Sequence, residues 1–242
     1  METVYGIHAV QSVIRHQPET VKVLYYDHKR QDQRLTQLLE AAGQQGIACQ
    51  GISRQKLDDK AGGERHQGVL IETSGKTRHP PLETLLAGLD QPAFLLVLDG
   101  VTDPHNLGAC LRTAEAAGVH AVIYPKDKSA GINATVRKVA CGAAEVLPVY
   151  AVTNLARTLD ELKALGIWIV GTAGEAEKSL YQLDLHGPMA LVMGAEGDGM
   201  RRLTRERCDY LAHLPMAGTV SSLNVSVATG ICLFEMVRQR SG

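Results

Sequence analysis

The sequence predicts an α/β protein in which a parallel sheet forms most of a large second domain and a smaller α/β unit precedes it. Short apolar runs that are continuous rather than alternating, such as FLLVLDG at residues 94–100, are typical of strands buried on both faces of a parallel sheet. Helical patterns separate these runs, which favours strand–helix–strand connections. The 242 residues, 45% of them hydrophobic, are enough for one large domain or two unequal ones with a sizeable core.

The smaller unit is predicted to span residues 1–75. Strands are expected at 21–26 and 68–73, with a weaker one at 47–52, and an apolar period typical of a helix runs from about 32 to 42. Together these elements predict a compact α/β unit.

A linker is predicted at residues 76–92, because glycine, proline and charged residues interrupt the pattern there. The second domain is predicted to span 93–242. Its further strands are expected in the segments AVIYP, IWIVGT and MALVMG, each ending near glycine or polar residues, and its last helix is expected in the second half of residues 215–240.

Composition excludes several classes of protein. A formal net charge of -1 provides no basic signal across the whole chain, so no DNA partner is expected. The five cysteines are odd in number and form no CxxC pair, which favours reduced thiols in the core over disulfides or a zinc site. No run approaches about 18 apolar residues, so no membrane partner is expected and the protein is predicted to be cytoplasmic.

Three loops are candidates for a binding site because each follows an apolar strand, at residues 99–112, 193–202 and 214–224. Ligands of α/β proteins bind at the carboxyl ends of parallel strands. Glycine-rich loops let backbone groups approach a ligand, and Leu214, Met216 and Leu223 offer apolar contact around a flat ring. The pattern suggests an adenine-bearing cofactor.

Several familiar chemistries lack their motifs. GAEGDG at 194–199 does not have the GxGxxG spacing of dinucleotide-binding proteins, and neither a GxxxxGK[ST] phosphate loop nor a GxSxG nucleophile elbow occurs. The nine histidines are scattered without HExxH spacing, so no metal site is predicted.

The segments NLGACLR (106–112), MGAEGDG (193–199) and LPMAGTVSSLNVSVA (214–228) resemble, in order and spacing, the three motifs of the SpoU branch of the SPOUT superfamily of RNA 2′-O-ribose methyltransferases. The VYGIHAV start and HQGV at 66–69 extend the resemblance to almost the whole chain. It is greatest to the enzymes that methylate a guanosine of 23S rRNA.

The resemblance implies a deep trefoil knot in the domain from about residue 93 onward, S-adenosylmethionine as cofactor, and a homodimer whose active site takes residues from both subunits. It also implies that the N-terminal unit is a ribosomal-protein-like RNA-binding domain. The expected partner is 23S rRNA or a large-subunit assembly intermediate.

Catalytic roles follow from the same resemblance. Arg112 matches the family's catalytic arginine; its high basicity favours holding the substrate phosphate and lowering the pKa of the hydroxyl, while a role as base stays open. Asn106 would position the hydroxyl or Arg112, and Glu196 would orient Arg112 or the substrate. The alternatives are a solvated or salt-bridged arginine, a helix N-cap for Asn106, and an acid at a helix start for Glu196.

The third motif contributes Ser222 and Asn224, which would bridge cofactor, phosphate and Arg112. The alternative for Ser222 is the N-cap of the last helix. Gly194, Leu214 and Leu223 match positions that contact the cofactor, with Met216 adjacent, and ordinary core packing is the alternative for the leucines.

Two basic groups are candidate contacts for RNA phosphates, with solvated surface as the alternative for both. One follows the second motif: Arg201, Arg202, Arg205 and Arg207. The other precedes the HQGV element: Arg54, Lys56, Lys60, Arg65 and His66. His8 either faces RNA or simply begins a helix.

The predicted function is therefore methyl transfer from S-adenosylmethionine to the ribose 2′-hydroxyl of a 23S rRNA guanosine. One alternative keeps the chemistry and changes the substrate to tRNA. Another, from a different class, is a non-catalytic RNA-binding factor in ribosome assembly.

Overall fold

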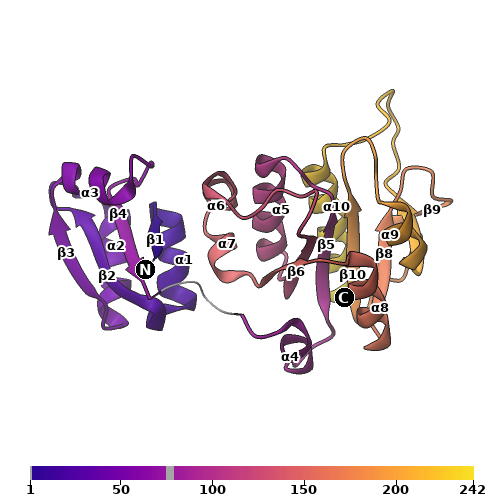
Figure 1. The fold of residues 1–242 in the computed structure, drawn as a ribbon, viewed down its shortest axis with the longest axis horizontal. Helices are drawn as coiled ribbons and strands as arrows, with labels where there is room; N and C mark the ends of the chain where they lie inside the picture. Colours follow the sequence, from indigo (N-terminus) through magenta and orange to yellow (C-terminus); the bar gives the residue numbers. More distant parts are fainter. Residues whose placement is uncertain (1, 75–78) are drawn as a thin grey trace. The chain divides into compact units, whose positions relative to one another are not determined.

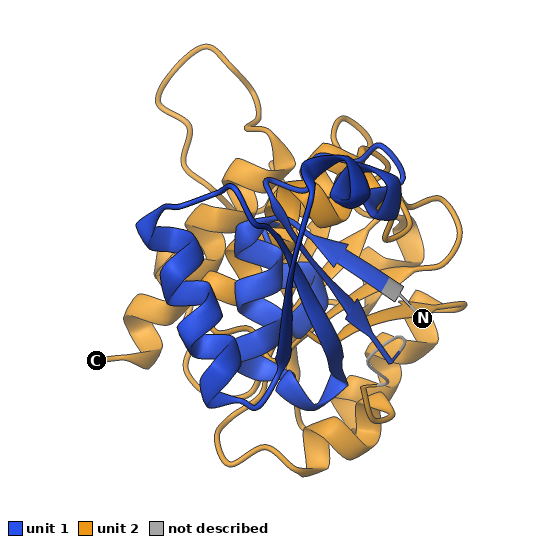
Figure 2. Ribbon diagram, turned by 90° about the vertical axis from the view of Figure 1, so that its left-hand side faces the viewer, with its two compact units in different colours: residues 1–78, 141–146 blue, residues 79–140, 147–242 orange. Residues whose placement is uncertain are grey.

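The computed structural model describes residues 2–74 and 79–242, and the chain divides into two compact units. Unit 1 comprises residues 1–78 and 141–146, and unit 2 comprises 79–140 and 147–242; Figure 2 draws them in blue and orange. Residues 76–78 of the predicted linker lie outside the described residues.

The sheet of unit 1 has the strand order β1-β4-β2-β3 (Figure 1). Its strands are β1 (Glu2–Tyr5), β2 (Val21–Asp27), β3 (Ala48–Ile52) and β4 (Val69–Thr73). β2 is parallel to β3 and antiparallel to β4, which is also antiparallel to β1. The three expected strands are present, whereas β1 has no counterpart in the prediction because four residues carry too short a pattern.

The helices of unit 1 are α1 (Ile7–His16), α2 (Gln33–Gln44), α3 (Arg54–Ala61), the 3₁₀ turn η1 (Pro18–Thr20) and α7 (Ala143–Val146). α2 begins where the sequence predicts a helix, because the Asp32 carboxylate accepts from the backbone N–H groups of Arg34 and Leu35. Its buried Leu35 and Leu38 join Val10, Ile14 and Leu24 in one core cluster.

The predicted parallel sheet is confirmed in unit 2. Its order is β7-β6-β5-β10-β8-β11-β9, and every strand pair is parallel. The strands are β5 (Phe94–Asp99), β6 (Ala121–Pro125), β7 (Val149–Val152), β8 (Trp168–Thr172), β9 (Lys178–Ser179), β10 (Met189–Gly194) and β11 (Tyr210–His213). Every residue of β5 and β6 is buried, which explains their unbroken apolar sequences.

The helices of unit 2 are α4 (Leu82–Ala87), α5 (Pro104–Ala116), α6 (Ala134–Ala140), α8 (Leu155–Ala164), α9 (Arg202–Arg207) and α10 (Val225–Arg240), with the 3₁₀ turn η2 (Leu180–Gln182). α5 packs against both α6 and α10, whereas α8 packs against α9 and β8. The predicted linker is partly helical, because α4 lies within it. Leu82, Leu85 and Leu86 of this helix pack against the core that contains residues of β5.

The cysteines only partly match the expectation that they fill the core. All five are free; Cys110 and Cys232 are buried, Cys208 is half-buried, and Cys49 and Cys141 are exposed. Burial raises the pKa of the Cys110 thiol to about 11 and that of Cys232 to about 12. In the described part of the chain, no helix is long and apolar enough to cross a membrane.

Leu24→Ala is expected to lower the free energy of unfolding by about 2–5 kcal/mol, because Leu24 is fully buried and the truncation leaves a cavity. Urea unfolding followed by circular dichroism measures the change. Lys22→Ala, on the same strand but exposed, is the control and should stay within about 0.5 kcal/mol of the parent. Equal effects of the two substitutions would contradict the described core.

Candidate active site

A cavity of about 800 Å³ lies at the carboxyl ends of β8, β10 and β11. It is formed by the loop that follows β10 and by two stretches of the chain between β11 and α10, so two of the three predicted site loops converge there. Seven residues predicted for the site line it: Gly194, Glu196, Leu214, Met216, Ser222, Leu223 and Asn224.

The loop after β10 is held at its base by the buried carboxylate of Asp99. Arg201 donates its backbone N–H to Asp99 Oδ2 at 2.8 Å and its Nε–H to Oδ1 at 2.6 Å. Gly194 permits the chain to close on itself, because a Cβ there would lie 2.2 Å from the Gly199 carbonyl carbon. The loop therefore projects Glu196, which is exposed, from a fixed base.

One oxygen of Glu196 joins the three predicted motifs. Its Oε1 accepts from Asn106 Nδ2 at 3.2 Å, from Asn224 Nδ2 at 2.7 Å and from the Val225 backbone N–H at 3.1 Å. The Asn224 amide also donates to Asn106 Oδ1 at 2.9 Å. Within the described chain the second oxygen, Oε2, has no hydrogen-bond partner, so it is free to accept from a ligand.

The start of α10 is organised by Asn224 rather than by Ser222. Asn224 is the N-cap, and its Oδ1 accepts from the Ser226 backbone N–H at 2.9 Å and the Ser226 hydroxyl at 2.6 Å. The interpretation of Ser222 as an N-cap is therefore wrong. Its exposed hydroxyl lines the cavity and is available to a ligand.

The first turn of α5 carries Asn106, but the N-cap there is Asp103, which accepts from the backbone N–H groups of His105 and Asn106. The N-cap interpretation of Asn106 is wrong, and its side chain is directed to Glu196 and Asn224 instead. Glu196 does serve a helix start, that of α10, whereas the prediction considered the helix near residue 202.

Arg112 is not brought to this cluster. It lies on α5 with an exposed side chain and has no hydrogen-bond or ion-pair partner among residues 2–74 and 79–242. Six residues separate it from Asn106, which places it about 240° around the helix from that side chain. Asn106, Glu196, Ser222 and Asn224 therefore gather within one chain, and Arg112 stands apart.

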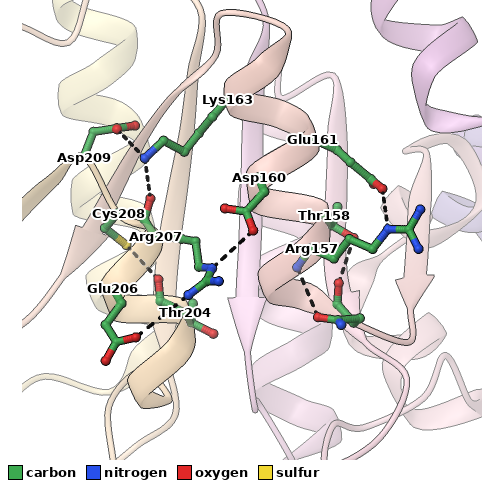
Figure 3. Close-up of polar contacts among 11 residues, drawn as sticks. Arg157, Thr158, Asp160, Glu161, Lys163, Thr204, Glu206, Arg207, Cys208 and Asp209 are labelled. Atoms are coloured by element: carbon green, nitrogen blue, oxygen red, sulfur yellow. Dashed lines mark hydrogen bonds and ion pairs between the residues drawn. The ribbon is translucent and has the colours of Figure 1, made fainter.

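The arginines after the second motif are all paired with acids. Arg202 bonds to Glu206 at 2.6 Å, Arg205 bonds to Glu175, and Arg207 contacts Asp160 of α8 at 3.3 Å. Figure 3 shows the last contact beside the ion pair of Lys163 and Asp209. With Arg201 held by Asp99, this group offers no unpaired cation, which favours the solvated-surface interpretation over phosphate binding.

Asp99 is the site residue that the prediction missed, although it lies in the first predicted loop. The available signal was a carboxylate that ends an entirely apolar run, FLLVLD. Such a residue cannot remain charged and buried without a partner. No set of three potential metal ligands gathers anywhere in the described ranges.

Two family models match the sequence. The SpoU rRNA Methylase family model matches residues 93–234, and a model described as RNA 2′-O ribose methyltransferase substrate binding matches residues 3–78. The matches cover the greater part of the chain.

Two curated relatives align along almost their whole length. The 23S rRNA (guanosine-2′-O-)-methyltransferase RlmB of Pseudomonas aeruginosa is 63% identical over 242 residues, covering 99% of this chain and 97% of the relative. RlmB of Escherichia coli K12 is 60% identical, covering 99% of each chain.

Solved structures agree in fold. The SpoU methyltransferase AviRb of Streptomyces viridochromogenes, in complex with AdoMet, has a TM-score of 0.76 at 25% identity, covering 99% of this chain and 90% of that one. A TrmH/SpoU tRNA-modifying enzyme of A. aeolicus has a TM-score of 0.58 at 35% identity, but covers only 62% of this chain and 77% of its own. On these matches, the chain belongs to the SpoU rRNA methylase family.

Proposed function

We propose that the protein transfers the methyl group of S-adenosylmethionine to the ribose 2′-hydroxyl of a guanosine in 23S rRNA. The observation that carries the proposal is the Glu196 cluster, in which a carboxylate and two amides from three motifs meet, and of which Glu196 and Asn224 line the cavity. Near-complete alignment with 23S rRNA guanosine methyltransferases supports the substrate. This substrate also favours the expected cytoplasmic location.

The cavity fits S-adenosylmethionine in size and chemistry. Its volume of about 800 Å³ is that of a cofactor site, and backbone groups from Gly194 onward form part of its wall. Leu214, Leu223 and Met216 provide apolar surface. Glu196 and Asp198 favour a cationic ligand, whereas the lining pair Glu175 and Arg205 neutralise each other. When bound, the cofactor would supply an electrophilic methyl group on sulfonium.

The chain's own residues would orient the hydroxyl and manage its proton. The ribose oxygen would take the methyl group as the bond from its carbon to sulfur breaks, and the hydroxyl proton would pass to Glu196 Oε2. Glu196 Oε2 can accept the hydroxyl hydrogen bond while Oε1 stays fixed by three donors. Asn106 and Asn224 hold that carboxylate, and Ser222 offers a further hydroxyl to the substrate.

Arg112 enters the proposal through the dimer. It is exposed and unpaired in the described chain, as a residue that acts on a partner subunit's substrate would be. Its guanidinium would hold the phosphate next to the ribose and favour loss of the hydroxyl proton. The proposal thus includes a homodimer with shared active sites, together with the deep trefoil knot expected for residues 93–242.

Ribose methylation mapping on rRNA from cells that lack the protein tests the function directly. Purified protein with S-adenosylmethionine should restore one missing 2′-O-methyl mark at a 23S guanosine. Restoration on tRNA alone would support the tRNA enzyme instead, although the tRNA-modifying relative covers only 62% of this chain. If no RNA is methylated, the result would support the alternative function, a non-catalytic RNA-binding factor in ribosome assembly.

Arg112→Ala is expected to reduce methyl transfer about 100-fold or more, because the substrate phosphate loses its guanidinium partner. Arg112→Lys keeps the charge without the planar guanidinium, so its rate of methyl transfer should lie between those of Arg112→Ala and the parent protein. Arg157→Ala, at an exposed arginine of α8, is the matched control. Sedimentation should show that Arg112→Ala is still a dimer. If the variant instead loses the dimer, Arg112 has a structural role.

Glu196→Gln is expected to reduce methyl transfer by about 100-fold or more, because the carboxamide cannot take up a proton. The affinity for S-adenosylmethionine, measured by calorimetry, should change much less, since one carbonyl oxygen can still accept the three hydrogen bonds. Glu177→Gln, at an exposed acid outside the cavity, serves as control. Unchanged transfer in Glu196→Gln would remove this carboxylate from the reaction.

A further inference from the structure

Unit 1 contains a second cavity, of about 550 Å³, that the methyltransferase site does not use. Basic side chains from separate elements line it: His8 at the start of α1, Lys29 and Arg30 after β2, Arg34 on α2 and Arg54 on α3. We refer to it as the basic cavity. Of the group predicted before the HQGV element, only Arg54 reaches it.

Three of these cations are free to bind a ligand. Lys29, Arg34 and Arg54 are exposed, and their side chains have no hydrogen-bond or ion-pair partner in the described part of the chain. Arg30, by contrast, is held by Asp32 and by the Gln67 carbonyl. A single carboxylate, Asp27, belongs to the lining, so the cavity is strongly cationic.

The turn at Gln67 and Gly68 forms another part of the lining. His66 is buried, accepts the Gly68 backbone N–H on Nδ1 at 3.0 Å, and contacts Asp58 through Nε2 at 2.8 Å. This arrangement keeps Gln67 at φ 52° and Gly68 at φ 76°, both in the left-handed region. A non-glycine residue held there costs about 1–3 kcal/mol, and such strain is concentrated at functional sites.

The turn also joins the start of α1. Gln67 Oε1 accepts the Ile7 backbone N–H at 3.2 Å, and both residues line the basic cavity. The N-cap Gly6 provides no side-chain cap, and the first turn of α1 contains no acid. The partial positive charge of this ten-residue helix therefore adds to the cations around it.

We infer that the basic cavity binds a phosphodiester and its neighbouring ribose in the RNA substrate, an inference that rests on the proposed function. Guanidinium groups pair with phosphate through two parallel hydrogen bonds. Asp27, whose Oδ1 accepts the Lys29 backbone N–H, then offers its other oxygen to a 2′-hydroxyl, which RNA has and DNA lacks. An acidic peptide has no such hydroxyl.

The double variant Arg34→Gln/Arg54→Gln in the full-length protein tests this inference by binding alone, without a methyl donor. Binding of an unmodified 23S rRNA transcript should weaken about 10-fold or more at 150 mM salt, and the slope of log K against log salt should fall in magnitude by about 1–2. Arg15→Gln/Lys22→Gln is the control, since it removes the same charge from exposed positions of unit 1 outside the cavity.

Three further measurements make the result decisive. Thermal unfolding should show both double variants folded. Asp27→Asn should reduce the preference for the transcript over DNA of the same sequence. Equal losses in the two double variants would overturn the inference, and so would an equal loss for DNA or poly-glutamate, which would indicate a general anion-binding surface. Methyl transfer by the parent protein tests the proposed function separately. The proposed function and the inference about the basic cavity can therefore each fail without the other.

Discussion

The site depends on one oxygen atom, Oε1 of Glu196, which accepts from two side-chain amides and one backbone amide. Its donors come from the first turn of α5 and the first two residues at the start of α10, which are more than 100 positions apart in the chain. A carboxylate oxygen that accepts several hydrogen bonds is costly to displace, since each donor would lose a charged partner. The arrangement fixes Asn106 and Asn224 and leaves Oε2 without a hydrogen-bond partner in the described chain.

Glu196 can act in this way because its loop has a fixed base. Asp99 is buried at the end of β5 and would be strongly destabilising without its two contacts to Arg201. The close approach at Gly194 and the pairing of Ala195 with Gly199 shape the rest of the loop. Parallel pairing of β5 and β10 brings both strand ends to the same edge of the sheet.

The same design, in which buried polar groups hold an exposed loop, occurs in unit 1. His66 fixes the turn at Gln67 and Gly68 from within, much as Asp99 fixes the loop of Glu196 in unit 2. In each unit a buried residue, Asp99 or His66, fixes the backbone of a loop by hydrogen bonds, and exposed residues of that loop remain accessible to a ligand.

Much of the fold follows from local pattern, because unbroken apolar strands and amphipathic helices depend on nearby residues. The strands at 21–27, 94–99 and 189–194, the helix after Asp32 and the position of the site loops belong to this class. Motif order also suggested Asn106, Glu196 and Asn224 as a set. By contrast, β1 and α4 are short and gain their order from packing, so no local signal identified them.

Sequence by itself thus determined the class of the fold, the family and a set of candidate polar residues for the site that did not include Asp99. Only the tertiary structure decided which of these residues meet: Asn224 rather than Ser222 caps α10, Asp99 anchors the loop, the arginines after residue 200 are paired, and Arg112 stands apart from Glu196. The physical reason is that hydrogen bonds and ion pairs between distant segments depend on the spatial approach of their atoms, which strand pairing creates and residue order does not encode locally.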